Sequence, residues 1–558
     1  MLMLKLLFKR IINVNIDLEF FITFLFLNAG FLLLYFSQII TQNGIVLDEK
    51  ILFRILGYGA TLISEVFVVS VLLSKKKKCQ KVIIYISAAF FILDFYSIFY
   101  YNTVFNYALF EIILATNFNE AFEFLSVHFD YKIFILIVFI FCVIKFVGHK
   151  INQGVYIQKN KKLLNIIMLF NLLLTVCMWG GITYKNPNNL FWLTNCISLE
   201  RMVTLPLNAY IETIQYDNYK KMYGNKDIEI QNNANIPYIV FVLGESMNRN
   251  HMQLYGYHLN NNPNLSKKEK NLFVFNDVIS PQSGTLQVLK VLFSFYNGDG
   301  KDNFYNNENL FFVLRKSGYS TTWISNQDNN NISSNLGLLY AEVCDRFYFT
   351  QDFFDELNYD GKILPLIDQA IKSEENKYNF YVIHLMGAHE EYAKRYPDTF
   401  KKFDLNDEKS FDGSMISKKV RSDYDNAVLY NDYIVNAIIE KFINKNAMII
   451  YVSDHGEEVY EDRAFSGHYP NGNFNMIEIP MIIYVTNEFK LKFPELVNKI
   501  KMSVNKPFVT NDMIHSLLDI MNIDNKNLVK ERSIFNEKFN ITSKRIYNGQ
   551  IYTKEWRN

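Results

Sequence analysis

The sequence predicts two parts, a bundle of five membrane-spanning α-helices followed by an α/β domain with a mainly parallel central sheet. Half of the 558 residues are hydrophobic, and five long apolar stretches lie in the first third of the chain. From residue 236 onward, strand-like runs alternate with helical patterns, an order typical of parallel sheets. Two of these runs end in polar residues, at the edge where open parallel sheets bind their ligands.

The five apolar stretches are each close to the roughly 20 residues that an α-helix needs to cross a hydrocarbon core. Because four more stretches follow the first, and no small-residue cleavage site stands out, we expect a retained anchor rather than a signal peptide. We therefore assign residues 1–182 to a five-helix transmembrane domain. The predicted spans cover residues 19–40, 51–73, 82–104, 131–148 and 163–182.

Basic residues are concentrated on one side of these spans. Three precede the first span, five lysines fill the loop after the second at positions 75–78 and 81, and more surround the fourth. The other loops are acidic. Because Lys and Arg in short loops stay on the cytoplasmic side, the amino terminus is predicted to lie inside. An odd number of spans then places everything after residue 182 outside.

Net charge and cysteine content exclude several classes of protein. A formal net charge of +1, with no basic strip carrying interleaved aromatic residues, gives no indication of nucleic acid as a partner. Only Cys196 and Cys344 fall on the predicted outer side, so at most one external disulfide can form. Without a Cys-x-x-Cys pair, neither a thiolate zinc site nor a disulfide framework is indicated.

The outer part divides into an interfacial connector, residues 183–235, and a catalytic domain, residues 236–558. Helical patterns are predicted at residues 285–295, 310–317 and 420–442, with Gly318 as a C-cap. Strands are predicted at residues 236–243, 319–325, 380–385, 447–453 and 481–485.

Two predicted strand ends offer ligands that could converge. The first is followed by Glu245, and the strand near residue 450 is followed by Asp454 and His455. Carboxylate and imidazole groups are donors that zinc accepts and that manganese tolerates. A carboxylate next to a histidine at a strand end has no obvious packing role, so these residues indicate a metal or catalytic site.

Thr285 is the best candidate for a nucleophile. It opens the helical pattern 285–295, where free backbone N–H groups and the helix dipole favour an alkoxide and a bound phosphoryl oxygen. Ser283 competes for the same role, and an ordinary helix cap is the alternative for both residues. His384, His389 and His468 also follow predicted strands or the Asp454 loop, and each could equally be a structural histidine.

Taken together and in this order, the motifs resemble those of phosphoethanolamine transferases. Those enzymes are integral inner-membrane proteins with five spans and a periplasmic domain of the alkaline phosphatase and sulfatase fold. The resemblance covers essentially the whole chain. The matching elements are Gly244-Glu245-Ser246, Ser283-Gly284-Thr285, His384-x-Met386-Gly387-x-His389, Ser453-Asp454-His455-Gly456-Glu457 and Gly467-His468.

The resemblance implies a role for each site residue. Zinc, favoured over manganese, would be held by Glu245, Thr285, Asp454 and His455, with Thr285 as the nucleophile. His389 and His468 would bind the phosphate of the donor or a second zinc, and could carry protons.

Three further residues would contact the donor lipid. Thr116 and Glu120 are similar to a family Thr-x-x-x-Glu element on an outward loop, although this spacing alone is typical of a helix surface. Asn326 lies in a Trp-x-x-Asn element, but the lysine that often follows is absent, and Asp328 is followed by asparagines 329–331 instead.

The implied reaction transfers phosphoethanolamine from phosphatidylethanolamine to an envelope saccharide, the lipid A or core of lipopolysaccharide, through a phosphothreonine intermediate. We expect a monomer in the bacterial inner membrane, with a cytoplasmic amino terminus and a periplasmic catalytic domain. The alternatives are a phosphoglycerol transferase of the lipoteichoic-acid-synthase type and a non-catalytic membrane sensor. A sulfatase reaction is disfavoured because no Cys-x-Pro-x-Arg precursor of formylglycine occurs.

Overall fold

The computed structural model divides into two compact units, residues 1–113 with 128–211 and residues 114–127 with 212–558. The domain boundaries at residues 182 and 235 stay predictions. Apart from isolated positions between 121 and 157, the structure describes residues 16–30, 49–101, 103–116, 197–223, 228–298, 302–327, 336–350, 358–408, 411–469, 472–547 and 550–553.

The first unit is helical where it is described. Its helices α2, α4 and α5 share an apolar core that includes Phe20, Phe24, Leu62, Val66 and Phe91. Within the described residues, α5 is long and apolar enough to cross a membrane. The bounds are α2 Leu18–Leu27, α4 Glu49–Leu73, α5 Lys77–Tyr101, α6 Tyr107–Ala115 and α11 Ser198–Tyr223, with β1 Ile16–Asp17 paired to β2 Tyr156–Ile157.

The second predicted span therefore falls on α4 and most of the third on α5, while only the first part of the first span falls on α2. Residues 31–40 of the first span, and the fourth and fifth spans almost entirely, lie outside the described residues. Polar contacts attach the start of α11 to this unit. Arg201 forms a buried bidentate pair with Asp94, at 2.5 and 2.7 Å, and the Ser198 backbone N–H donates to Asn28 Oδ1 at 2.6 Å. Charged groups inside an apolar bundle are tolerated when they are paired in this way.

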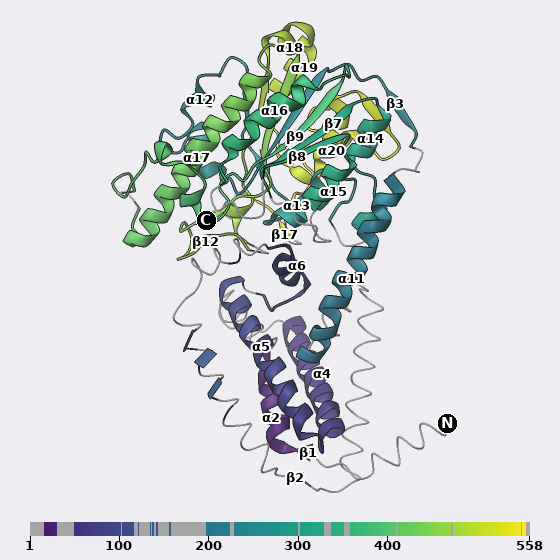
Figure 1. The fold of residues 1–558 in the computed structure, drawn as a ribbon, viewed down its shortest axis with the longest axis vertical. Helices are drawn as coiled ribbons and strands as arrows, with labels where there is room; N and C mark the ends of the chain where they lie inside the picture. The colour runs from purple at the N-terminus through teal and green to yellow at the C-terminus, as the bar shows by residue number, and fades with distance from the viewer. Residues whose placement is uncertain are drawn as a thin grey trace. The chain divides into compact units, whose positions relative to one another are not determined.

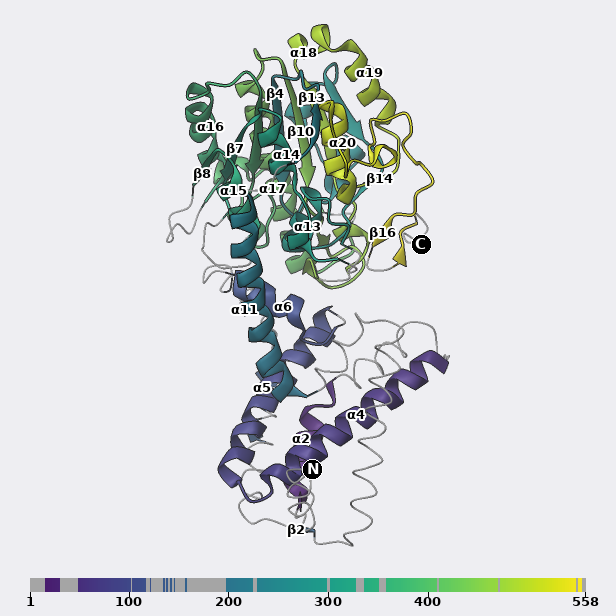
Figure 2. The ribbon, with the colours of Figure 1, turned by 90° about the vertical axis from the view of Figure 1, so that its right-hand side faces the viewer.

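The second unit is built on a seven-stranded sheet in the order β5-β13-β10-β4-β9-β7-β8. Figure 1 labels β7, β8 and β9 of this sheet, and Figure 2 labels β4, β10 and β13. The five strands from β10 to β8 run in the same direction, and β13 pairs antiparallel with both β10 and β5. The predicted parallel sheet is thus present, with a mixed edge. Its strands are β4 Tyr238–Gly244, β5 Leu272–Phe275, β7 Ser320–Ser325, β8 Arg346–Phe349, β9 Asn379–His384, β10 Ala447–Ser453 and β13 Met481–Val485.

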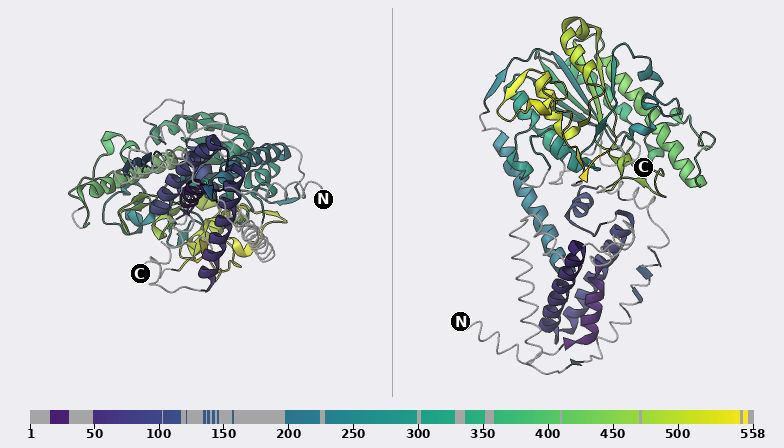
Figure 3. Two further views of the ribbon diagram at one scale, coloured as in Figure 1. Left: turned by 90° about the horizontal axis from the view of Figure 1, so that it is seen from below. Right: turned by 180° about the vertical axis from the view of Figure 1, so that it is seen from behind.

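Helices cover both faces of this sheet, which explains why its inner strands are buried along their whole length. One core joins the sheet to α13, α14, α15 and α20, and the other joins it to α16 and α17 (Figures 2 and 3). The helices are α12 Pro263–Ser266, α13 Thr285–Leu292, α14 Leu310–Lys316, α15 Leu336–Val343, α16 Ile363–Lys372, α17 Met415–Lys441, α18 Asn487–Lys492, α19 Pro494–Ser503 and α20 Met513–Ile520.

Among the described residues of the second unit, four short strand pairs lie outside the main sheet. The pairs are β3 Ile230–Asn232 with β15 Ile523–Asn525, β6 Val278–Ile279 with β14 Phe508–Val509, β11 Glu458–Val459 with β12 Ser466–Gly467, and β16 Ile546–Tyr547 with β17 Gln550–Ile551.

The predicted helices are present, with two shifted ends. Helix α13 stops at Leu292, and α17 begins five residues before the predicted start, where the Ser414 hydroxyl caps it by accepting the Ser417 N–H at 3.1 Å. Gly318 has φ +79 and directly follows the C-cap residue of α14, so a left-handed turn ends this helix as expected.

The strand register decides where the site forms. Ser453 pairs with Gly244, and His384 pairs with both Leu243 and Ser325. The carboxyl ends of β10, β4, β9 and β7 are therefore level, and the loops that follow them start from one edge of the sheet.

Candidate metal centre and nucleophile

Three buried side chains from adjacent strand ends form a compact donor cluster. Glu245 follows β4, and Asp454 and His455 follow β10; one ligand atom from each lies within 4.8 Å of the other two. His455 Nε2 is 3.2 Å from Glu245 Oε1 and 3.4 Å from Asp454 Oδ2. The structure thus brings together the ligands predicted from the two strand ends.

Backbone N–H groups hold these carboxylates in place. Asp454 Oδ1 accepts the N–H of Ser246 at 3.1 Å and that of His455 at 2.7 Å. Ser246 has φ +62, a conformation that L-residues rarely adopt, and its hydroxyl donates to Glu245 Oε1 at 2.8 Å. Unusual backbone at such a position is common in functional sites, where the surrounding structure holds it.

A tight turn after β9 supports Glu245 from the other side. Gly387 has φ +54, and a Cβ there would lie 2.4 Å from the Glu245 carbonyl oxygen, so only glycine fits. The buried carboxylate of Asp360 accepts the N–H groups of Met386 at 2.8 Å and Gly387 at 3.0 Å. The Gly387 element of the sequence motif is therefore explained by close backbone packing.

Thr285 places its hydroxyl against the cluster. As the first residue of α13, it has its Oγ1 3.1 Å from Glu245 Oε2 and 3.2 Å from His455 Nε2. Thr285 is half-buried, so its hydroxyl can be reached. Ser283 is buried, and its hydroxyl donates to the Tyr469 carbonyl at 2.6 Å, which leaves Thr285 as the better nucleophile.

The pKa shifts of Glu245, Asp454 and His455 show that the cluster has too little positive charge for its two carboxylates. Burial and the neighbouring Glu245 raise the pKa of Asp454 to about 8. Burial lowers the pKa of His455, but Asp454 and Glu245 outweigh it and raise this pKa to about 10. Burial opposes the charged form of Glu245 as well, and the nearby histidines bring its pKa below the usual range. Two close carboxylates thus compete for one imidazolium.

The donor atoms fit a divalent cation. Asp454 Oδ2 is fully buried and has no hydrogen-bond partner among the described residues. His455 Nδ1 lies 2.9 Å from the Gly456 carbonyl, to which it can only donate, so in the neutral ring that a metal binds, the lone pair is on Nε2, which faces the carboxylates. Metal-binding histidines usually make such a second contact. Oxygen and nitrogen donors of this kind match zinc.

His468 adjoins this cluster and is oriented by a residue that sequence reasoning missed. Its ring centroid lies 4.1 Å from that of His455, and its Nδ1 is 2.9 Å from Glu457 Oε1. Glu457 is fully buried and also accepts the Tyr392 hydroxyl. His455, Glu457 and His468 form a second group of possible metal ligands. Glu457 stands two residues after His455 in the motif, and that spacing was the available signal.

The other candidate residues are placed differently. His389 and His468 both lie close enough to lower the pKa of Glu245. His384 is buried against Trp323, neither ring nitrogen has a partner among the described residues, and burial lowers its pKa to about 4. It is therefore a neutral core residue. Asn326 is also fully buried, and its amide bonds to Asn358 and Asp360.

The remaining predictions concern the membrane side and the cysteines. Thr116 is half-buried just after α6, while Glu120 lies outside the described residues. Cys344 is a buried free thiol, and Cys196 is not among the described residues.

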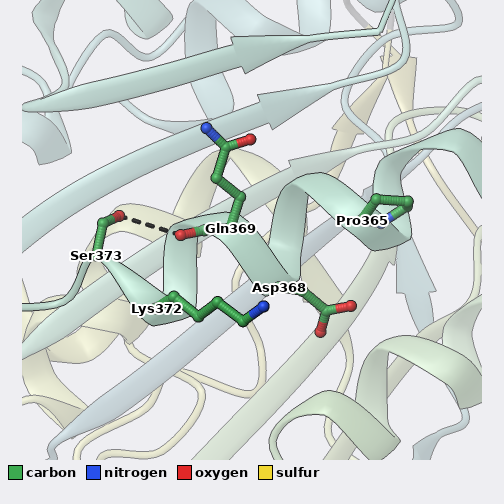
Figure 4. Close-up of a pocket in the computed structure, with 5 residues that line it drawn as sticks. All are labelled: Pro365, Asp368, Gln369, Lys372 and Ser373. Atoms are coloured by element: carbon green, nitrogen blue, oxygen red, sulfur yellow. Dashed lines mark hydrogen bonds between the residues drawn. The ribbon is translucent and has the colours of Figure 1, made fainter.

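One surface hollow lies on helix α16 and is unrelated to this chemistry. It is lined by Pro365, Asp368, Gln369, Lys372 and Ser373, and the Ser373 hydroxyl donates to the Gln369 carbonyl at 3.2 Å (Figure 4). None of the donor residues lines it, so it is not a candidate for the site.

A comparison with protein families matches residues 237–523, just over half of the chain, to the model described as sulfatase. Among curated proteins, phosphoethanolamine transferase EptC of Escherichia coli (strain K12) is 27% identical over 472 residues, which cover 80% of each chain. This similarity confirms the resemblance that the motifs predicted.

Solved structures agree with the fold. The periplasmic domain of Escherichia coli EptC, crystallised in complex with zinc, is 28% identical, covers 59% of this chain and 94% of its own, and has a TM-score of 0.52. The integral membrane protein EptA from Neisseria meningitidis covers 92% of this chain and 97% of its own at 19% identity, with a TM-score of 0.62. The latter supports a fold with a membrane part as well as a sulfatase-like domain.

Proposed function

This chain belongs to the sulfatase family, and on that premise we propose that it transfers phosphoethanolamine from phosphatidylethanolamine to an envelope saccharide, the lipid A or core of lipopolysaccharide. The observation that carries the proposal is the Thr285 hydroxyl, which lies against Glu245 and His455 at the start of α13. Three curated relatives are phosphoethanolamine transferases by name, which favours this reaction over phosphoglycerol transfer.

Zinc is the metal that the residues fit. Glu245, Thr285, Asp454 and His455 would hold it, and the unpartnered Asp454 oxygen is the strongest indication. When bound, zinc supplies positive charge that polarises a phosphoryl oxygen and lowers the pKa of the Thr285 hydroxyl. His468 with Glu457 could hold a second ion, and metal analysis of an Asp454→Asn and a His468→Ala variant would count the ions separately.

In the first half of the reaction, Thr285 Oγ1 attacks phosphorus and forms a new O–P bond. The bond from phosphorus to the diacylglycerol oxygen breaks, and its electron pair leaves with that oxygen. Thr285 loses one proton and the diacylglycerol oxygen gains one, so a group near the site must carry a proton between them. His389 and His468 are the candidates, and Glu457 fixes the ring of His468 for this purpose.

In the second half, an acceptor oxygen attacks the phosphothreonine ester. The Oγ1–P bond breaks, the acceptor gains phosphoethanolamine, and its proton returns to Thr285 through the same histidine. The half-buried position of Thr285, beside ligands that are fully buried, suits a nucleophile that two substrates must reach in turn.

The proposed location follows from the charge distribution of the sequence. The lysine-rich loops would lie in the cytoplasm and the sulfatase-like domain in the periplasm, with the chain anchored by five spans in the inner membrane. Membrane anchoring is consistent with a donor that is itself a lipid. Thr116, Glu120 and Asn326 stay candidates for contacts to that donor, and the chain would act as a monomer.

The test is expression of the full chain and of Thr285→Ala in a Gram-negative host that lacks its own phosphoethanolamine transferases. Mass spectrometry of lipid A and core should show a phosphoethanolamine adduct with the wild type and none with the variant. In parallel, purified protein incubated with phosphatidylethanolamine should release diacylglycerol and gain one phosphoethanolamine on Thr285. An adduct that persists in Thr285→Ala, or wild-type protein that never reacts with the donor, would contradict the proposal.

A further inference from the structure

A second buried ionic cluster lies beside the site and connects three loops. It consists of His251, Glu408, Arg421, Asp425 and Glu461, which we call the hairpin clasp. His251 Nδ1 is 3.1 Å from Asp425 Oδ1, and its Nε2 is 2.5 Å from Glu461 Oε1. Because both ring nitrogens face carboxylates, both must donate, and His251 is a charged bridge between them.

Arg421 supplies the second positive charge of the clasp. Its Nε donates to Glu408 Oε2 at 2.8 Å, and its Nη1 lies 3.6 Å from Glu461 Oε1. The Tyr257 hydroxyl also donates to Asp425 Oδ2 at 3.0 Å. Four of the five clasp side chains are at most 9% exposed, and Glu461 is 22% exposed. Each of the five side chains has at least one charged or hydrogen-bonded partner, and such pairing makes a buried network rigid.

The clasp contacts the hairpin formed by β11 and β12 through the backbone of Val459. The Val459 N–H donates to Glu461 Oε2 at 2.5 Å, and the Val459 carbonyl accepts Arg421 Nη1 at 2.7 Å. Val459 pairs with Ser466, and the next pair of the hairpin is Glu458 with Gly467. Directly beyond that pair, the two strands continue into Glu457 and His468, which bond to each other.

The other end of the clasp holds the loop that carries Glu245. His251 lies on the short helix η2, Arg249–His251, which follows β4 by four residues. In the same loop, the Asn248 N–H donates to the Tyr424 hydroxyl, which in turn donates to the Ser246 carbonyl, both at 2.8 Å. The clasp therefore connects the Glu245 loop to the hairpin that presents His468.

From this arrangement we infer that Glu461, His251 and Arg421 are positioning residues, which hold His468 and Glu457 in register with the Thr285 centre during phosphoryl transfer. The inference rests on the proposed function, because it assigns the clasp to the same reaction. The clasp residues touch no reacting atom; they act through Val459 and the hairpin. A purely structural role would lower stability alone and would leave the turnover of folded protein unchanged.

The first test compares full-length Glu461→Ala, Glu461→Gln and wild type in detergent, with a phosphatidylethanolamine donor. We expect Glu461→Ala to lower kcat at least 10-fold, with KM for the donor within twofold and zinc content unchanged. Glu461→Gln should recover most of the loss, because its amide oxygen still accepts the Val459 N–H. Asp368→Ala is the matched control, since it removes a half-exposed ion pair to Lys441 at the far end of α17.

A double-mutant cycle shows whether the clasp acts through His468. If it does, Glu461→Ala should cost at least 10-fold in the wild-type background and less than twofold in His468→Ala. Hydrogen exchange gives a readout that needs no activity: amides of residues 456–468 should exchange at least 10-fold faster in Glu461→Ala, and those of β4 and β9 should not.

Each outcome decides the matter. Unchanged kcat with unchanged exchange, or a cost that is the same in both backgrounds, would overturn the positioning role. Wild-type protein that fails to react with the donor would instead contradict the proposed function, and the exchange experiment would still report on the clasp.

Discussion

Two buried clusters in the catalytic domain each set one histidine between two carboxylates, but they differ in how the charges are satisfied. In the hairpin clasp, His251 donates through both ring nitrogens, one to Asp425 and one to Glu461, and Arg421 adds a second positive charge. In the metal centre, His455 gives its Nδ1 proton to a backbone carbonyl, and a single nitrogen faces both Glu245 and Asp454.

The difference teaches which cluster is built for rigidity and which for a ligand. The clasp carries two positive charges against three carboxylates, and each carboxylate contacts a donor through at least one oxygen, although Glu408 Oε1 is buried without a hydrogen-bond partner among the described residues. The centre leaves a buried oxygen of Asp454 without a partner. Two buried carboxylates that share one imidazole nitrogen are costly inside a protein unless a cation joins them, so this imbalance predicts metal binding.

The largest effect on the metal centre is expected from a substitution of Thr285. Thr285→Ala should lower transfer by on the order of 1000-fold or more, because the reaction loses its nucleophile and not merely a contact. The measurement is the rate of diacylglycerol release from labelled donor. Thr285→Ser, which keeps the hydroxyl, should retain a measurable rate and full zinc content. Equal activity in Thr285→Ala and wild type would remove Thr285 from the mechanism.

Asp454 and Asp425 form a matched pair of buried aspartates for the second prediction. Asp454→Asn should lower zinc affinity and activity by on the order of 100-fold or more, since even outer partners of a metal ligand contribute 10- to 100-fold. Asp425→Asn should keep its full zinc content. Metal analysis after dialysis against a weak chelator measures both.

The same pair should show opposite effects on stability once the metal is removed. The raised pKa of Asp454 means that its charge opposes folding at alkaline pH, so Asp454→Asn should raise the Tm of metal-free protein at pH 9. Burial raises the pKa of Asp425 as well, but its contacts with His251 and Tyr257 oppose this rise. Asp425→Asn takes one carboxylate from the charged His251 and should therefore lower Tm at pH 7, where His251 is protonated. Two decreases of similar size would show that the clusters do not differ in the proposed way.

Gly387 tests how closely the metal centre depends on backbone packing. Gly387→Ala would push a Cβ against the Glu245 carbonyl oxygen and strain a left-handed residue, so we expect about 2 to 4 kcal/mol of destabilisation together with loss of zinc. Gly256→Ala is the control, because Gly256 has φ +96 but open space around it, and only about 1 kcal/mol of backbone cost applies. Chemical denaturation measures both variants.

Much of this architecture could be predicted from the sequence because local patterns carry it. Apolar runs predicted five of the seven strands of the sheet, all but β5 and β8, and the residues directly after two of them include Glu245, Asp454 and His455. The clasp could not be found in this way. His251, Arg421 and Glu461 are far apart in the chain, and only the packing of α17 against two loops brings them together. For the same reason the buried position of Asn326 was not visible from its motif.

The last prediction separates the clasp from the centre by its pH dependence. Burial lowers the pKa of His251, but Glu461 and Asp425 outweigh it and raise this pKa from 6.5 to about 9. A raised histidine pKa gives stability that is complete below pH 6.5 and is lost as the pH rises through 9, up to about 3 kcal/mol. The Tm of zinc-saturated wild type should therefore fall as the pH rises from 6.5 to 9, and the Tm of His251→Gln should fall clearly less over the same pH range.

Because bound zinc keeps the ligands of the metal centre from titrating, the difference in Tm between the two proteins reports on the clasp alone. Parallel curves would mean that His251 is neutral in the folded protein, and the bridge between Asp425 and Glu461 would then carry no charge.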